Sequence, residues 1–479
     1  MALKKKIIIY IIMLISSIVI LTFAFWAIDI FCKYNPGEEV RITLTSDYVD
    51  HISRSDFQKR KHVSILSEYI ADNSIGYLNR DGSKTIYIYA IPIHYFNSNS
   101  NQWVPIDTRI RNVSDKAMRE SGYIYTIADS DIKSFYPRMI SSEQGILLQH
   151  DFEYSFGVRP SKTIGAEYVK KENFIGDEKN MVSYSGVFGD GTQFNLSPSL
   201  LGTNCEIHFS EKPKDSYIEF WISVPKNVYL RKEPGGYAVM TQNIADENGR
   251  ISEQIVGIIQ SPIQKNQNKT YSYRGSLDIE KEDNGQYTLK VNLDMASASR
   301  DMTIYLSFEM RKEKQSDNTI YSQIPNLKNA YLCNYALVGN NQEKGIGRMM
   351  IRYFFTHKVK LGSFRIQNAS YKIYAFPNAP DKLLLSPIME EWCSMLGNWN
   401  SHYAIGEAVS EIEISAPGEI QFGITEEVRK WYADPLRITE QYGLMLQSNS
   451  EMEGRYSIIL TGDNALYNNH VEMTIVGKE

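Results

Sequence analysis

The segment from Tyr287 to Leu293 reads Tyr-Thr-Leu-Lys-Val-Asn-Leu and places a large apolar side chain at every second position. Neighbouring side chains of a strand point to opposite faces of a sheet, so this period of two predicts a strand with one buried face. Asn284-Gly285 lies just before it, and both residues tolerate the positive φ angles of a tight turn. With the strand-like run Leu277–Glu280 on the other side of that turn, the segment predicts a β-hairpin.

The same alternation and the same turn chemistry recur along the chain. In residues 86–90, Ile86, Ile88 and Ala90 alternate with two tyrosines, and we expect another strand with one buried face; residues 217–224 are strand-like and largely apolar. Further turns are predicted at Asp81-Gly82, Asp190-Gly191 and Asn248-Gly249. Amphipathic helix patterns are nearly absent, and the best one runs from Thr425 to Tyr432. The patterns therefore predict an all-β fold.

Composition agrees with that class and excludes some functions. Of the 479 residues, 43% are hydrophobic and 22% charged, which is typical of a folded body. The 12% of aromatic residues, including 32 tyrosines, favours β structure. The net charge of −5 provides no basic field, so we expect no nucleic-acid partner.

The N-terminus carries a membrane signal. Lys4, Lys5 and Lys6 precede an uncharged run from Ile7 to Ile28 that is long enough to cross the hydrocarbon core as a helix. Lysines stay on the cytoplasmic side, so we expect a cytoplasmic tail over 1–6, a transmembrane signal anchor over 7–28, and a single-pass protein of the cell membrane with its body outside the cytoplasm. The bulky exit Phe25-Trp26-Ala27-Ile28 favours this anchor over the alternative, a cleaved signal peptide.

Beyond the anchor the sequence divides into three parts. Residues 29–74 are polar and predict a stalk, either a short helix behind Ser55-Asp56 or a solvated linker. Residues 75–312 predict a β-rich extracytoplasmic domain, and a charged stretch at 311–316 marks a boundary. Residues 316–479 predict a C-terminal jelly-roll-like β-sandwich that is long enough to bury its own core and to fold alone.

No catalytic or metal motif is present. The chain has no Gly-x-Ser-x-Gly, no phosphate-binding loop and no His-Glu-x-x-His, so we expect no enzyme activity, no cofactor and no metal. Asp129-Ser130-Asp131 has alternating oxygen ligands but lacks the glycine and the distal Glu of a calcium loop. His94 fits a hydrogen-bonded structural role better than a site. The acidic pairs Glu390-Glu391 and Glu426-Glu427 fit solvated surface better than the two facing carboxylates of a glycosidase.

The cysteines and tryptophans leave two questions open. Four cysteines are too few and too scattered for a disulfide framework, although a Cys333–Cys393 bridge is an open alternative. Trp392, Trp399 and Trp431 are the candidate ligand-binding residues, because exposed rings can stack on the faces of sugars. The alternative is that these three side chains belong to the core.

A set of short motifs in the C-terminal block points to a family. In order they are Asp317–Ile320, Ile324–Asn326, Val338-Gly339, Arg348–Phe354, Ile366–Tyr374, Phe422–Trp431 and Gly443-Leu444. They resemble the strands and the single short helix of a DNRLRE domain, a β-sandwich of bacterial surface proteins that is similar to a carbohydrate-binding module family. The chain departs from this pattern at Arg352 and at Ala465-Leu466-Tyr467, which stands in place of a Pro-rich ending.

Two motifs of the preceding block carry a second resemblance. Ile91-Pro92-Ile93-His94-Tyr95 and Gln102-Trp103-Val104-Pro105-Ile106-Asp107 resemble the leader region of bacterial YD-repeat (Rhs-type) wall-associated proteins. The resemblance covers their front end alone, so it implies no toxin activity and no catalytic residue.

Together the patterns and the resemblances predict a membrane-anchored binding or scaffolding module of the bacterial cell surface, in contact with a cell-wall or extracellular polysaccharide or with a protein. The alternatives are a glycan hydrolase with an unrecognised site and a purely structural spacer. A row of exposed aromatics with polar neighbours favours binding, whereas a cleft with two facing carboxylates favours hydrolysis.

Overall fold

The computed structural model of the chain describes residues 62–478, apart from 151–153, 162–165, 172–179, 246–250, 268–270, 273, 282–284, 311–316, 328–332, 334, 353–363, 393–396, 434–440 and 462–471. The predicted tail, anchor and boundary stretch at 311–316 lie outside the described residues, as does the predicted turn Asn248-Gly249. Over the part of the chain that is described, no helix is long and apolar enough to cross a membrane. The described chain is built almost entirely of strands in sandwich-like sheets, which confirms the all-β prediction.

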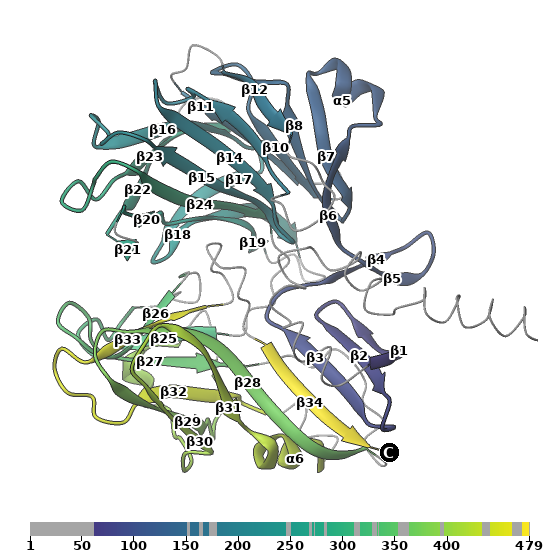
Figure 1. The fold of residues 1–479 in the computed structure, drawn as a ribbon, viewed down its shortest axis with the longest axis vertical. Coiled ribbons are helices and arrows are strands. Elements are labelled where there is room, and N and C mark those ends of the chain that lie inside the picture. Colours follow the sequence, from purple (N-terminus) through teal and green to yellow (C-terminus); the bar gives the residue numbers. More distant parts are fainter. Residues whose placement is uncertain are drawn as a thin grey trace, which may run out of the picture.

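Residues 107–310 form a two-layer unit, here called the central lobe, at the top of Figure 1. Within the described ranges its first sheet has eight strands, in spatial order β22 (Ser276–Lys281), β23 (Gln286–Asn292), β16 (Tyr217–Ser223), β11 (Tyr154–Pro160), β10 (Ile146–His150), β8 (Ile132–Pro137), β7 (Tyr123–Asp129) and β6 (Asp107–Asn112). A short helix, α5 (Lys116–Glu120), follows β6.

The second sheet of the central lobe contains eleven described strands. Its order is β17 (Val228–Glu233), β18 (Gly236–Ala245), β19 (Ile251–Gln260), β24 (Met302–Met310), β15 (Gly202–Phe209), β14 (Thr192–Pro198), β13 (Val182–Ser185), β12 (Ala166–Lys171) and β9 (Met139–Ile140), with β20 (Ile263–Lys265) paired to β24 and to β21 (Tyr271–Ser272). Aromatic rings fill the space between the two sheets. Phe220 of the first sheet lies 6.0 Å from Phe308 and 6.1 Å from Phe194 of the second, between ring centroids.

A second unit, here called the terminal lobe, combines both ends of the described chain. Its sheet of thirteen described strands runs in the order β1 (His62–Ala71), β2 (Ser74–Asn79), β3 (Lys84–Tyr89), β34 (Glu472–Lys478), β28 (Arg365–Pro377), β33 (Tyr456–Leu460), β26 (Tyr335–Asn341), β27 (Gly345–Ile351), β32 (Leu444–Ser448), β29 (Asp381–Pro387) and β30 (Ser410–Ile414), with β25 (Asp317–Tyr321) on β27 and β31 (Gly418–Gly423) on β28. Figure 1 shows the purple start of the described chain beside its yellow end.

The predicted stalk is wrong over its described part. Residues 62–71 form β1, which pairs with β2 through a tight connection at Ala71 and Ser74, and they form neither a helix nor a linker. The polar, helix-spaced pattern misled because β1 is an edge strand with much of its surface exposed. Strands β2 and β3 also differ from expectation, since they fall in the range predicted for the first domain and yet extend the sheet of the C-terminal block.

Strand β3 is buried on both faces rather than on one. Ile86 and Ile88 are fully buried in the core of the terminal lobe, where Ile86 lies opposite Ile475 of β34. On the other face Tyr87 and Tyr89 are buried in the cluster that fills the central lobe. The strand therefore joins the cores of the two lobes, and its tyrosines are core residues of the junction.

Several local predictions are confirmed. β22 and β23 form the expected hairpin, with Leu289 and Val291 buried and Gly285 at a φ of +77°. Asn284 of that turn lies outside the described residues. Helix α6 (Thr425–Ala433) occurs where it was expected and buries one face, made up of Glu427, Val428, Trp431 and Tyr432.

Candidate functional site

Two of the three candidate tryptophans are core residues. Trp392 is 7% exposed and its indole N–H donates to the carbonyl oxygen of Tyr442 at 2.5 Å. Trp431 is 6% exposed and donates to Oε1 of Glu427 at 3.0 Å. Neither ring has a free face for a sugar. We therefore do not retain these two residues as ligand-binding residues, because tertiary packing has made them part of the core.

Trp399 is half-buried and also serves packing. It lies in the 3-10 turn η3 (Trp399–Ser401) and packs against a small cluster on β27 and β32 that includes Trp392. The guanidinium of Arg348 stands 4.9 Å from the centroid of its ring and occupies one face. The described part of the C-terminal block thus brings Trp392 and Trp399 together as a packed cluster rather than as an open platform.

His94 and Glu427, which were also singled out from the sequence, have structural partners. His94 is buried, and its Nδ1 lies 2.7 Å from the carbonyl oxygen of Ala71 at the end of β1. Burial lowers the pKa of His94 to about 4, so the ring is neutral at physiological pH and Nδ1–H donates. Glu427 is buried and bonded to Lys430 and Trp431, so it is not a solvated acid. Cys333 is buried, while Cys393 lies outside the described residues, so the bridge between them stays a prediction.

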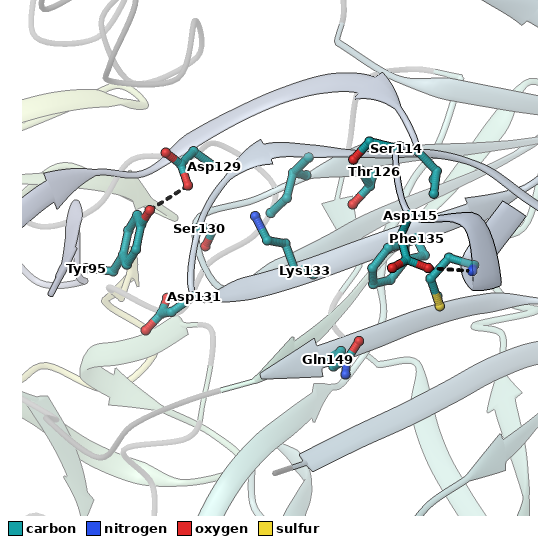
Figure 2. A pocket seen from close by; sticks show the side chains of 13 residues that line it. Tyr95, Ser114, Asp115, Thr126, Asp129, Ser130, Asp131, Lys133, Phe135 and Gln149 are labelled. Carbon is teal, nitrogen blue, oxygen red and sulfur yellow. Dashed lines mark hydrogen bonds between the residues drawn. The ribbon is translucent and has the colours of Figure 1, made fainter. Parts of the chain in front are cut away.

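A cavity of about 600 Å³ opens instead in the central lobe (Figure 2). It lies on the outer face of β7, β8 and β10 and is bordered by the segment that leads into α5. Its volume is within the range of small-molecule sites. Its walls combine polar and apolar side chains, namely Tyr95, Val113, Ser114, Asp115, Met118, Thr126, Ile127, Asp129, Ser130, Asp131, Lys133, Phe135 and Gln149.

Strand alternation explains why β8 serves both the core and the cavity. Ser134 Oγ donates to the carbonyl oxygen of Gly202, and the Tyr136 hydroxyl bonds to Thr203, so these side chains point towards the second sheet. Lys133 and Phe135, at the intervening positions, point to the opposite face and line the cavity. Gln149 of β10 lies directly opposite Lys133 in the antiparallel register and widens this polar wall.

The Asp129-Ser130-Asp131 motif forms the connection from β7 to β8 at one end of the cavity (Figure 2). The backbone N–H of Ile132 donates to Ser130 Oγ at 3.0 Å, which holds this connection in shape. Asp131 also lies 3.5 Å from Nε2 of His150. No group of three or more His, Cys, Asp or Glu side chains within the described ranges is placed to hold a metal ion. Both carboxylates line the cavity, where their oxygens can accept hydrogen bonds.

Tyr95 closes the same end of the cavity from a separate element. It belongs to β4 (His94–Asn97), which pairs with β5 (Gln102–Pro105) in a two-stranded hairpin. The Tyr95 hydroxyl donates to Oδ1 of Asp129 at 2.5 Å, as Figure 2 shows. Burial and this carboxylate raise the pKa of Tyr95 to about 12, so the hydroxyl keeps its proton at neutral pH.

The charges of the cavity favour neutral or cationic ligands. Burial lowers the pKa of Lys133, while the nearby carboxylates of Asp129, Asp131 and Asp107 act in the opposite direction. The lining has three acidic side chains, Asp115, Asp129 and Asp131, and one basic one, Lys133, so its formal charge is 1 − 3 = −2. A polyanion would be repelled, whereas hydroxyl groups find both acceptors and donors.

The opposite end of the cavity offers further polar groups. Asp115 caps α5, where its side chain accepts from the backbone N–H of Met118 at 2.9 Å. Thr126 lines the cavity, and its Oγ1 is buried and without a hydrogen-bond partner among the described residues. A buried hydroxyl without a partner is costly, so Thr126 is a polar group of this wall that the protein itself leaves unsatisfied among the described residues.

Comparisons with known proteins add little to this geometry. No family model matches the chain, and no curated protein matches it either. Among solved structures, the chain is similar to a glycoside hydrolase family 43 arabinoxylan arabinofuranohydrolase from Bacillus subtilis, solved in complex with cellotetraose. The identity is 10%, 86% of this chain and 96% of that chain are covered, and the TM-score is 0.13. A likeness this low carries no argument about fold or activity.

Sequence reasoning missed most of this site. Asp129 and Asp131 were considered only as calcium ligands, and Tyr95 only as part of a structural motif. Lys133 and Gln149 gave no signal, because single polar residues on the outer face of a strand are indistinguishable from ordinary surface. The one usable signal was the excess of side-chain oxygens at residues 129–131, next to a strand with alternating polarity.

Proposed function

We propose that the chain is a membrane-anchored extracytoplasmic binding module of the bacterial cell surface, and that it holds a neutral polysaccharide in the cavity of the central lobe. The observation that carries the proposal is the convergence of Tyr95, Asp129, Lys133 and Gln149 above an apolar floor that includes Phe135. Sugars present hydroxyls along their edges and C–H groups on their faces, so they match such a mixed lining.

The proposed ligand site differs from the one expected from the sequence. The resemblance to a DNRLRE domain favoured the C-terminal sandwich, but Trp392 and Trp431 are buried there. The DNRLRE and Rhs-type resemblances remain part of the proposal as the reason for placing the chain at a bacterial surface. They supply no residue of the proposed site except Tyr95.

The membrane part of the proposal is supported by Lys4–Lys6 and the uncharged run at 7–28. Protease added to intact protoplasts should degrade the body of the protein, because everything beyond the anchor lies outside. A body that stays protected until the membrane is lysed would contradict this topology.

Binding to the cavity is tested with the purified full chain and a set of neutral and acidic wall and plant polysaccharides, by calorimetry and by retention on insoluble polymer. We expect micromolar to millimolar affinity for a neutral polymer. Asp129→Asn and Gln149→Ala should each weaken binding by about tenfold, the equivalent of one lost hydrogen bond to a charged or polar group. The matched control is Asp278→Asn, an exposed acid on β22 at the far edge of the same sheet.

The alternatives give distinct results in the same experiment. A spacer would be retained on none of the polymers. A glycan hydrolase would release reducing sugar, and the release would fall with Asp129→Asn or with the corresponding change at Asp131. If neither cavity variant changes retention on the polymer, the protein binds polysaccharide, but at a site other than this cavity.

A further inference from the structure

The β4–β5 hairpin carries a pair of exposed aromatic rings. It projects from the body between the two lobes in Figure 1. Phe96 is 50% exposed and Trp103 is 37% exposed. Their centroids lie 5.4 Å apart with the ring planes at 73°. Large apolar side chains that are exposed next to each other on a projecting element are unusual in a folded protein and mark contact sites.

The pair is held in place by the hairpin itself. Phe96 and Trp103 are directly opposite each other in the antiparallel register, as are Tyr95 and Val104. Alternation places Phe96 on the side of the hairpin that faces away from Tyr95 and the cavity. One short ribbon therefore presents the Tyr95 hydroxyl to the cavity on one face and two rings to solvent on the other.

The end of the hairpin is uncharged and pre-organised. From Tyr95 to Ile106 the chain has no acidic or basic side chain, although 22% of the whole chain is charged. Oδ1 of Asn97 accepts from the backbone N–H groups of Asn99 and Ser100, at 3.0 and 3.2 Å, which fixes the start of the turn. Asn101 completes it with a φ of +53°. Such a turn offers amide and hydroxyl groups at a low entropic cost of binding.

We infer that Phe96 and Trp103 form a second sugar-stacking site, which binds another part of the neutral glycan chain proposed to occupy the cavity; this inference rests on the proposed function. Aromatic rings contact the C–H faces of a pyranose, and neighbouring amides and hydroxyls bond its edges without any need for charge. A lipid bilayer fits less well, because polar Asn and Ser side chains at the tip would have to enter it before the rings could.

The site makes a specific prediction about ligand length. The rings lie one residue along the strand from Tyr95, on the other face of the ribbon, so only an oligosaccharide long enough to pass around the hairpin reaches both sites. Affinity of the wild-type chain should therefore rise between short and longer oligosaccharides of the same sugar.

The test measures that rise by calorimetry for the wild-type full chain, Trp103→Ala, Phe96→Ala with Trp103→Ala, and Trp103→Phe. Loss of the indole should lower affinity for the long ligand about tenfold, with little change for the short one. Trp103→Phe should restore much of the gain. The control is Tyr217→Ala, which removes another exposed ring, 38% exposed, from β16 of the central lobe, away from the hairpin. A thermal melt of each variant serves to check that it is folded.

The outcomes separate this inference from the proposed function. If Asp129→Asn weakens binding while Trp103→Ala leaves the length dependence intact, the stacking site is overturned and the cavity stands. If the double variant instead loses affinity for vesicles of phosphatidylglycerol and phosphatidylethanolamine and not for glycan, the rings bind lipid and the inference is overturned. A wild-type chain that is retained on no glycan overturns both.

Discussion

The central and terminal lobes are assembled from the chain in different ways. The described strands of the central lobe come from one continuous stretch, residues 107–310, whereas the terminal lobe combines residues 62–89 with residues 317–478. A contiguous lobe can be recognised as a block of strands in the sequence. A lobe that closes only when two segments far apart in the sequence meet cannot, because strand patterns do not say which partner a strand will take.

The lobes also differ in what they do with aromatic side chains. The terminal lobe buries Trp392 and Trp431, while the hairpin beside the central lobe exposes Trp103. Residue type alone does not distinguish these cases. The difference lies in whether neighbouring elements cover the ring.

The largest effect is expected from removing strands β1–β3. The segment 316–479 alone should aggregate or melt without cooperativity, contrary to what its length predicts, because the edge of β34 and the pocket left by Ile86 and Ile88 would be exposed. Burial of those two side chains is worth about 1.5–3 kcal/mol each. Circular dichroism melts and dye binding measure this.

The matched construction joins residues 62–89 through a flexible linker to the start of the same segment. It should recover a cooperative transition. Cooperative melting of 316–479 without the added strands would show that the terminal lobe has a complete core of its own, and the contrast between the lobes would fail.

The second-largest effect on stability is expected from removing a buried tryptophan ring. Trp431→Ala should lower the free energy of unfolding by about 3–5 kcal/mol, because it leaves a cavity in the core and removes one of the two hydrogen-bond partners of the buried Glu427. Urea titration measures the change. A loss below about 1 kcal/mol would mean that the ring is not part of the packed core.

The junction between the lobes should be sensitive to acid through His94. Its folded-state pKa of about 4 lies below the unfolded value near 6.5. Between these two pH values His94 binds a proton in the unfolded state but not in the folded state. The free energy of unfolding therefore falls as the pH is lowered from about 6.5 to 4. The loss amounts to about 3 kcal/mol.

Urea titrations over that pH range test this, with His94→Gln as the control. Glutamine does not titrate, so the variant should lack this part of the acid-dependent loss, whatever its stability at neutral pH. Equal slopes in the two proteins would exclude His94 as the group responsible.

The smallest effect on stability is expected for Trp103→Ala. An exposed ring on a hairpin contributes little to the core, and the free energy of unfolding should change by less than about 0.5 kcal/mol. If Trp103→Ala leaves the free energy of unfolding this little changed, a loss of glycan binding in the variant can be attributed to the lost contact between the ring and the sugar. A destabilisation of the size expected for Trp431→Ala would show that the hairpin rings support the fold.

Much of the local structure could be predicted. The alternation at Tyr287–Leu293, the glycine turns at Gly82, Gly191 and Gly285, and the helix at Thr425–Tyr432 all occur as expected. These features depend on interactions between near neighbours, such as side-chain alternation, tolerance of positive φ and one apolar helix face. Each of these features is therefore encoded by a short stretch of sequence.

Short-range patterns along the chain were enough to predict the class of fold, several of its strands and turns, and the lack of a recognisable catalytic motif. Three outcomes depended on the tertiary structure: β3 joins two cores, Trp392 and Trp431 are buried, and Tyr95 bonds Asp129 at one end of a cavity. These outcomes depend on contacts between residues that are tens to hundreds of positions apart in the sequence. A short pattern records which faces are apolar, but not what will cover them.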